Sequence, residues 1–151
     1  MAIGFFYGSI AALWMILIIS TVKKPLTFKH IMLAITAMGY SLLYETSLGA
    51  YMGLYYYINP ENSLFYIIIS AVFIYPIVEV IYTLFLPEKF YPAIIYTAVW
   101  TALMLAFELA SIYAGTVVLT GWRIVPWSIV TYIVTFSWIN LLFRYLKKRS
   151  L

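Results

Sequence analysis

The sequence predicts an all-α integral membrane protein, a bundle in which five transmembrane helices cross the bilayer. Two thirds of the 151 residues are hydrophobic and 9% are charged, whereas about 25% of the residues in a soluble domain are charged. The apolar segments run for roughly twenty residues or more, which is enough to cross the hydrocarbon core. They lack the alternating pattern of barrel strands, so helices are expected to satisfy the backbone in lipid.

Short polar turns separate the five segments. We expect helices over residues 3–22, 31–58, 64–86, 91–119 and 126–146. The first segment has no positive charge before it and no small-residue cleavage site after it, so we expect it to stay in the mature protein. No internal repeat, linker or low-complexity tail divides the chain, and residues 1–151 are expected to form a single transmembrane domain.

The basic residues predict the orientation of the bundle. Five crossings place the loop at Lys23–His30, the loop at Pro87–Phe90 and the C-terminus on one side, which then carries eight of the nine lysines and arginines. By the positive-inside rule this side is cytoplasmic and the N-terminus is outside. The net charge of +4 is therefore read as a topology signal. The expected partner is the lipid bilayer and not nucleic acid.

Three of the five acidic residues, Glu45, Glu79 and Glu108, lie inside the predicted spans. An ionisable group near the bilayer centre costs on the order of 2.5–3.5 kcal/mol on insertion scales, so these side chains are expected to face protein or water. No basic residue lies deep in a span to pair with them, and we expect at least one to be protonated at neutral pH. Glu45 and Glu108 are expected near the midplane, with Glu79 about 6 Å closer to the cytoplasm.

Hydroxyl groups share helix faces with these carboxyls. The spacings of three and four residues between them are those of one face of a helix. A proline three residues before Glu79 is expected to bend its helix, and such bends often admit water or ligand. The residues expected to bind a ligand or proton are Glu108, Glu45, Glu79, Thr101, Ser111, Ser41, Tyr75 and Tyr82.

The polar helix faces and the proline bend before Glu79 also have a purely structural interpretation. A polar or small stripe inside a membrane helix is typical of a seam between two helices. The bend near Glu79 is equally compatible with a packing kink in which a protonated carboxyl bonds to neighbouring backbone. Glu108 favours a functional role more strongly, because helix seams are usually joined by serine and threonine and not by a costly carboxyl.

The loop before the fifth segment supplies two further candidates, Trp122 and Arg123. Its two tryptophans, Trp122 and Trp127, indicate a return to the membrane interface. The chain has no cysteine, and its one histidine, His30, is expected in a loop. No metal site or cofactor is expected, and no hydrolase, kinase or zinc-protease motif assigns a catalytic residue.

The C-terminal half contains the stretches FIYPIVEVIYTLFLPEKF, YTAVWTALMLAFELASIYAG and GWRIVPWS. Together they resemble a family of small multi-pass membrane proteins found mainly in spore-forming Gram-positive bacteria. Their matching positions are Pro76, Pro87 with Lys89, Phe107 with Glu108, and Gly121 with Trp122. The resemblance implies a multi-pass protein of the bacterial cytoplasmic membrane and supplies no activity.

A more limited likeness is to membrane carotenoid cyclases, which place Pro-x-Glu and Phe-Glu pairs in their spans. This chain has Phe107 with Glu108, but it has Pro76-x-x-Glu79 in place of Pro-x-Glu and lacks a paired second acid. The likeness implies carboxyl chemistry on an isoprenoid-like substrate.

Three functions remain open. The favoured one is a non-enzymatic membrane protein whose buried carboxyls, centred on Glu108, bind a proton, a cation or a small ligand. A bundle of this size has little room for a private pathway, which favours a homo-oligomer or a subunit of a larger membrane complex. The second is a membrane enzyme that uses glutamates as acid and base on an isoprenoid-like or lipid substrate. The third is a structural or assembly factor whose carboxyls fix helix register.

Overall fold

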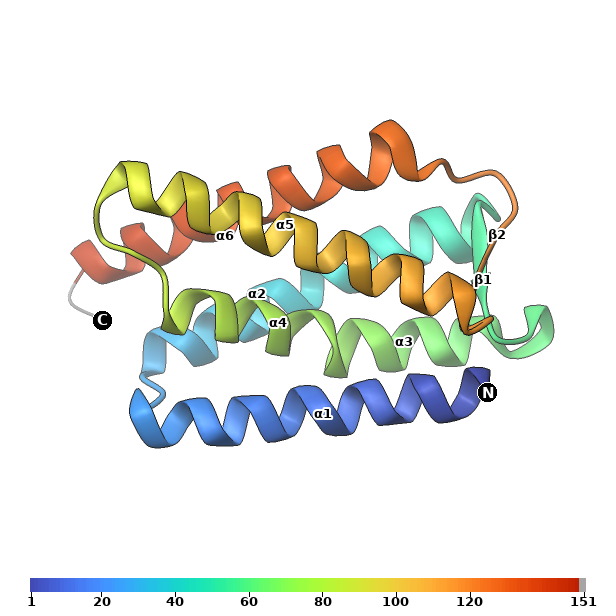
Figure 1. Ribbon diagram of the computed structural model, residues 1–151, viewed down its shortest axis with the longest axis horizontal. Helices are drawn as coiled ribbons and strands as arrows, with labels where there is room; N and C mark the ends of the chain where they lie inside the picture. The colour runs from blue at the N-terminus through green and yellow to red at the C-terminus, as the bar shows by residue number, and fades with distance from the viewer. Residues whose placement is uncertain (150–151) are drawn as a thin grey trace.

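The apolar segments form helices, and five helical stretches of the described residues are long and apolar enough to cross a membrane. The structure is a computed structural model that describes residues 1–149. In chain order the elements are α1 (Ala2–Lys23), α2 (Phe28–Glu45), the π-helix η1 (Thr46–Tyr51), β1 (Tyr55–Tyr57), the 3₁₀-helix η2 (Pro60–Asn62), α3 (Ser63–Phe73), α4 (Tyr75–Leu84), α5 (Phe90–Tyr113), β2 (Val117–Leu119), the π-helix η3 (Ile124–Ser128) and α6 (Ile129–Lys148) (Figure 1).

The outer surface of the bundle is strongly apolar. Large hydrophobic side chains are exposed on α1, α2, α5 and α6, where a water-soluble protein would carry charges. A lipid environment accommodates these side chains without cost. They include Met15, Ile19, Leu43, Ile95, Leu103 and Leu141.

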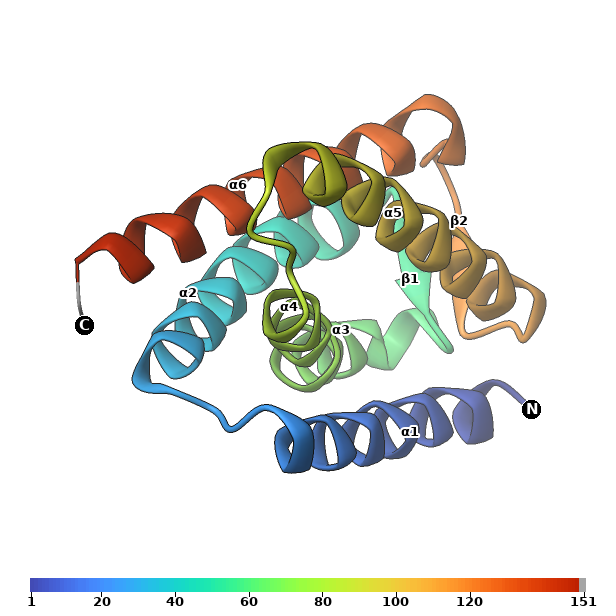
Figure 2. The same cartoon turned by 60° about the vertical axis from the view of Figure 1, so that its left-hand side comes forward.

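The α3–α4 segment forms the core. Every residue from Pro76 to Leu84 is buried, and the other helices surround this segment when the bundle is seen nearly along α4 (Figure 2). The helix breaks between Phe73 and Tyr75, as expected from Pro76, because proline lacks the backbone N–H that would continue the hydrogen-bond series.

Two of the expected helices end earlier than the sequence predicted. The second was expected to reach residue 58 and the fourth residue 119, but η1 ends at Tyr51 and α5 ends at Tyr113. Gly53 and Gly115 have φ of 63° and 75°, a left-handed conformation that ends helices and that glycine adopts without strain.

The segments beyond these glycines pair as the antiparallel strands β1 and β2. Tyr55 lies opposite Leu119, and Tyr57 lies opposite Val117. Aromatic and β-branched residues favour strands, and a short apolar run cannot be assigned to helix or strand by periodicity alone. This two-stranded ladder spans the end of the bundle where the N-terminus lies (Figure 1).

Backbone hydrogen bonds join the ladder to the loops beside it. The carbonyl oxygen of Leu54 accepts hydrogen bonds from the backbone N–H groups of Thr120, Gly121 and Trp122, at 2.9–3.0 Å. The Thr116 hydroxyl donates to the carbonyl oxygen of Ala2 at 3.0 Å, which attaches the start of α1 to this end. We call this the ladder end of the bundle.

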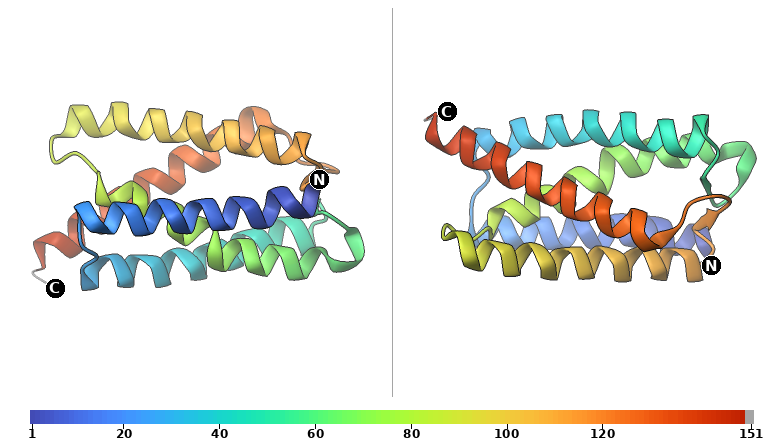
Figure 3. Two further views of the ribbon diagram at one scale, coloured as in Figure 1. Left: turned by 60° about the horizontal axis from the view of Figure 1, so that its bottom comes forward. Right: turned by 90° about the horizontal axis from the view of Figure 1, so that it is seen from above.

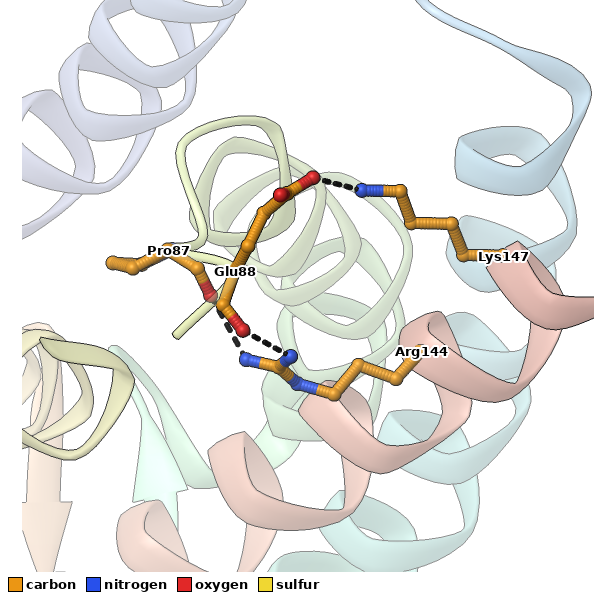
Figure 4. Close-up of polar contacts among 4 residues, drawn as sticks. All are labelled: Pro87, Glu88, Arg144 and Lys147. Atoms are coloured by element: carbon orange, nitrogen blue, oxygen red, sulfur yellow. Dashed lines mark hydrogen bonds and ion pairs between the residues drawn. The ribbon is translucent and has the colours of Figure 1, made fainter. Parts of the chain in front are cut away.

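The opposite end carries the C-terminus of α6 (Figure 3) and eight of the nine basic residues. Arg144 of α6 donates to the carbonyl oxygens of Pro87 and Glu88 at 2.8 and 2.7 Å, and Lys147 pairs with the Glu88 carboxylate at 2.6 Å (Figure 4). The Lys147 ammonium lowers the pKa of Glu88. The stabilisation from this exposed pair is therefore present at neutral pH and is lost as the pH falls through that lowered value.

We predict that Gly49→Ala destabilises the bundle. A Cβ at Gly49 would lie 2.8 Å from Ile67 Cδ1 and 2.9 Å from Tyr55 Cε2, so the Tyr55 ring and the core around it must shift. The expected loss is about 1–3 kcal/mol in the free energy of unfolding, measured in detergent. Gly39→Ala is the control, because a Cβ there meets no atom within 4 Å. Equal stability of the two variants would contradict this packing.

Candidate functional site

A cavity of about 110 Å³ lies inside the bundle, toward the ladder end. Its walls come from α1, α2, both strands, the α3–α4 junction, α5, η3 and α6. All three glutamates of the spans, Glu45, Glu79 and Glu108, line it. The sequence left open whether these carboxyls meet, because helix rotation decides the matter, and the structure brings them to one cavity.

Each carboxyl reaches the cavity from a different element. Glu45 is the last residue of α2, Glu79 lies on α4 just after the break at Pro76, and Glu108 lies near the end of α5. Glu45 and Glu79 are 6% and 3% exposed, while Glu108 is half-buried. The break at Pro76 therefore positions the most deeply buried of the three.

Glu108 lies in a closed set of hydrogen bonds to α6 and the segment before it. Ser128 donates to its Oε1 at 2.7 Å and Tyr132 donates to its Oε2 at 2.9 Å. The indole N–H of Trp122 in turn donates to the Ser128 hydroxyl at 2.9 Å. Both carboxyl oxygens are thus satisfied, and these bonds connect α5 to α6.

Glu45 is held by the tyrosines of the ladder and of α4. The Tyr57 hydroxyl donates to Glu45 Oε2 at 3.2 Å and lies 3.2 Å from the Tyr75 hydroxyl. Burial and the neighbouring Glu45 carboxylate raise the pKa of Tyr57, so this hydroxyl keeps its proton and acts as a donor. The chain of contacts joins α2, β1 and α4 beside the cavity.

Glu79 differs from the other two glutamates. Its Oε2 atom is buried and has no hydrogen-bond partner among residues 1–149. A buried oxygen of this kind forfeits the hydrogen bonds that it would make with water. The residue that carries this oxygen is one of those that line the cavity.

The depth of two carboxyls differs from the expectation. Glu108 lies five residues before the end of α5 and Glu45 six residues before the end of η1, within about 9 Å of those ends at the helical rise. Both therefore lie in the half of their helical stretch that faces the ladder end. The cause is the early helix termination at Gly53 and Gly115, because the expected midpoints were counted over longer helices.

The other residues expected at the site divide into two groups. Ser41, Ser111, Tyr75 and the loop residue Trp122 line the cavity. The second group does not reach the cavity and consists of Thr101, Tyr82 and Arg123.

Tyr82 and Thr101 lie toward the basic end, the end of the bundle opposite the ladder. Tyr82 pairs with Thr97 at 2.8 Å and stacks on Tyr96, and Thr101 is buried on α5 with its hydroxyl unpartnered within the described chain. Thr101 lies about two turns from Glu108, which is too far to reach the same space. Tyr82 lies only three residues from Glu79, but its hydroxyl bonds to Thr97 and it does not line the cavity. Arg123 is exposed in the loop.

Sequence reasoning missed the three residues that hold the carboxyls. Ser128 and Tyr132 are four residues apart at the start of the last helix, a spacing that places them on one helix face. That spacing was the available signal for this pair. No such signal existed for Tyr57, because its contact with Glu45 depends on the unexpected ladder.

The described part of the chain contains no group of three or more His, Cys, Asp or Glu side chains placed to hold a metal ion. The three glutamates enter the cavity from separate elements, and a serine and two tyrosines are the hydrogen-bond partners of Glu108 and Glu45.

No protein-family model matches the chain, and no curated protein or solved structure matches it. The geometry of the cavity is therefore the basis for the function proposed below.

We predict that Tyr132→Phe destabilises the bundle through Glu108. The change leaves Glu108 Oε2 without its donor, and an unsatisfied buried acceptor costs about 1–3 kcal/mol. Thermal or chemical unfolding in detergent measures this loss. Tyr40→Phe is the matched control, since Tyr40 also lines the cavity while its hydroxyl bonds to no residue in the described range. If both variants unfold alike, the Tyr132 bond contributes nothing.

Proposed function

We propose that this chain is a multi-pass membrane protein that binds a proton, a cation or a small ligand in the carboxyl-lined cavity, without catalysing a reaction. The observation that carries the proposal is the unpartnered Oε2 of Glu79, on a side chain that is 3% exposed and faces the cavity. Among the buried carboxyl oxygens of residues 1–149 it is the one without a hydrogen-bond partner, and an occupant of the cavity would complete its interactions.

The contacts of the other two carboxyls support a division of roles. Glu108 connects α5 to α6, and Glu45 connects α2 to the ladder, through hydrogen bonds that any register-fixing group would make. A purely structural role for the carboxyls accounts for these two. It does not account for Glu79, which makes no such bond through Oε2.

The cavity size favours binding over catalysis on an isoprenoid or lipid. A cavity of about 110 Å³ is smaller than the apolar cavity of about 150 Å³ that holds a benzene molecule. A long prenyl or acyl chain would extend well beyond this space. The carboxyl-dependent enzyme suggested by the carotenoid-cyclase likeness would need a larger substrate site.

The positive-inside rule supports the finer assignment of orientation. We place the basic end in the cytoplasm and the N-terminus outside, so that the cavity lies in the outer half of the bundle. The resemblance of the C-terminal half to small membrane proteins of spore-forming bacteria supports the bacterial cytoplasmic membrane as the location. A homo-oligomer or a larger membrane complex remains part of the proposal, on the argument of size.

The orientation is testable because the chain contains no cysteine. Single cysteines introduced as Asn62→Cys at the ladder end and Leu26→Cys at the basic end leave every basic residue in place. We expect a membrane-impermeant thiol reagent to label the Asn62 variant in intact bacterial cells, and the Leu26 variant after permeabilisation only. The reverse labelling pattern would overturn the orientation.

Carboxyl spectroscopy tests the binding function. We expect infrared difference spectra, recorded on changing the pH or on adding cations, to show a carboxyl band in the wild type that Glu79→Gln lacks. Glu61→Gln is the control, because Glu61 is exposed in the η2 turn. Circular dichroism and unfolding verify that both variants are folded. A wild-type carboxyl spectrum that no condition changes would overturn the proposal.

A further inference from the structure

We propose that the occupant of the cavity is a small amine in its ammonium form, which donates an N–H hydrogen bond to Glu79. The inference rests on the proposed function, since it names the ligand class of the same site. Four properties of the cavity lead to it: its charge, its aromatic walls, the unpartnered carboxyl oxygen of Glu79 and its size.

The charge of the cavity excludes anions. Three carboxyl groups line it, and no lysine, arginine or histidine is among the lining residues. The carboxyls of Glu45 and Glu108, which already accept hydrogen bonds, favour a positive charge nearby. Opposite charges attract strongly in a region of low dielectric. An anionic ligand would meet only repulsion.

The walls are rich in aromatic rings. They come from α1, the ladder, α4, α5, the loop before η3, and α6. The electron-rich face of an aromatic ring attracts an ammonium group, and the attraction is stronger where water is excluded. Carboxyls and rings around one space suit an organic cation better than a metal ion. The rings include those of Phe6, Tyr57, Tyr75, Phe107, Trp122 and Phe136.

The free acceptor determines which organic cation fits. Glu108 and Glu45 already accept hydrogen bonds from Ser128, Tyr132 and Tyr57. Glu79 Oε2 accepts none within residues 1–149, so the ligand must supply the donor. A primary, secondary or tertiary ammonium carries an N–H for this purpose. A quaternary ammonium carries none and would leave the oxygen unsatisfied.

The size of the cavity limits the ligand to a few heavy atoms. The apolar cavity that admits benzene measures about 150 Å³, and this cavity measures about 110 Å³. Small alkylammonium ions therefore match it, whereas polyamines and larger drug-like cations do not. tert-Butylammonium and tetramethylammonium make a matched pair of probes, because they share charge, shape and size and differ in the N–H groups.

The test compares these probes on the whole chain in detergent, by isothermal titration and by thermal unfolding. We expect tert-butylammonium to bind saturably and to raise the unfolding temperature. Tetramethylammonium and the neutral tert-butanol should bind about tenfold or more weakly, the cost of a missing charge-assisted hydrogen bond. The anion trimethylacetate should not bind. Glu79→Gln should weaken the binding of tert-butylammonium by a similar factor, while Glu61→Gln should leave its binding unchanged.

Several results would overturn the inference. Equal affinity for tert-butylammonium and tetramethylammonium in the wild type would show that no N–H bond to Glu79 forms, and this comparison needs no variant to fold. Absence of amine binding together with a Glu79-dependent infrared band would overturn the amine class and leave the proposed proton or cation site standing. Absence of both would overturn the proposed function as well.

Discussion

Inside an apolar bundle each polar group must find its partner within the protein, because little water is present to replace it. The backbone meets this constraint through helices and, where two helices end early, through the pairing of β1 with β2. The Leu54 carbonyl oxygen accepts three N–H groups from the adjacent loop, so even the turn that caps the bundle is satisfied. The constraint makes an unsatisfied buried carboxyl oxygen costly, and Glu79 Oε2 is the one such oxygen among residues 1–149.

The ladder shapes the site as well as the end of the bundle. Because α5 ends at Tyr113 and η1 at Tyr51, the chain turns back over the space between the helices and brings Tyr57 onto Glu45. If the helices had continued straight to residues 58 and 119, Tyr57 would lie away from the Glu45 carboxyl. The cavity therefore depends on two glycines with positive φ, Gly53 and Gly115.

Hydropathy and charge predicted the larger features of the fold. Five apolar runs and the basic loops were enough to find the helices and the end that collects the positive charge, and Pro76 marked the break between α3 and α4. The ladder was out of reach, since Tyr55–Tyr57 and Val117–Leu119 are apolar enough to continue a helix. Of the site, the glutamates were identifiable from their cost in lipid. The residues that donate hydrogen bonds to these glutamates could not be identified. Hydrogen bonds between helices depend on how each helix is rotated about its axis, which no single segment specifies.

The distribution of hydrogen bonds is compatible with a helix seam and with the proposed binding site in the same bundle. Carboxyls that only fix helix register would each be bonded across an interface, as Glu45 and Glu108 are. A carboxyl that only binds a ligand would lack such a bond within the protein, as Glu79 Oε2 does among residues 1–149. Two glutamates with fixed partners hold α2, α5 and α6 around the cavity, and the third remains free inside it. On the proposed function, the bonded pair would set the positions of the walls, and this structural role would hold the cavity in shape around the third carboxyl.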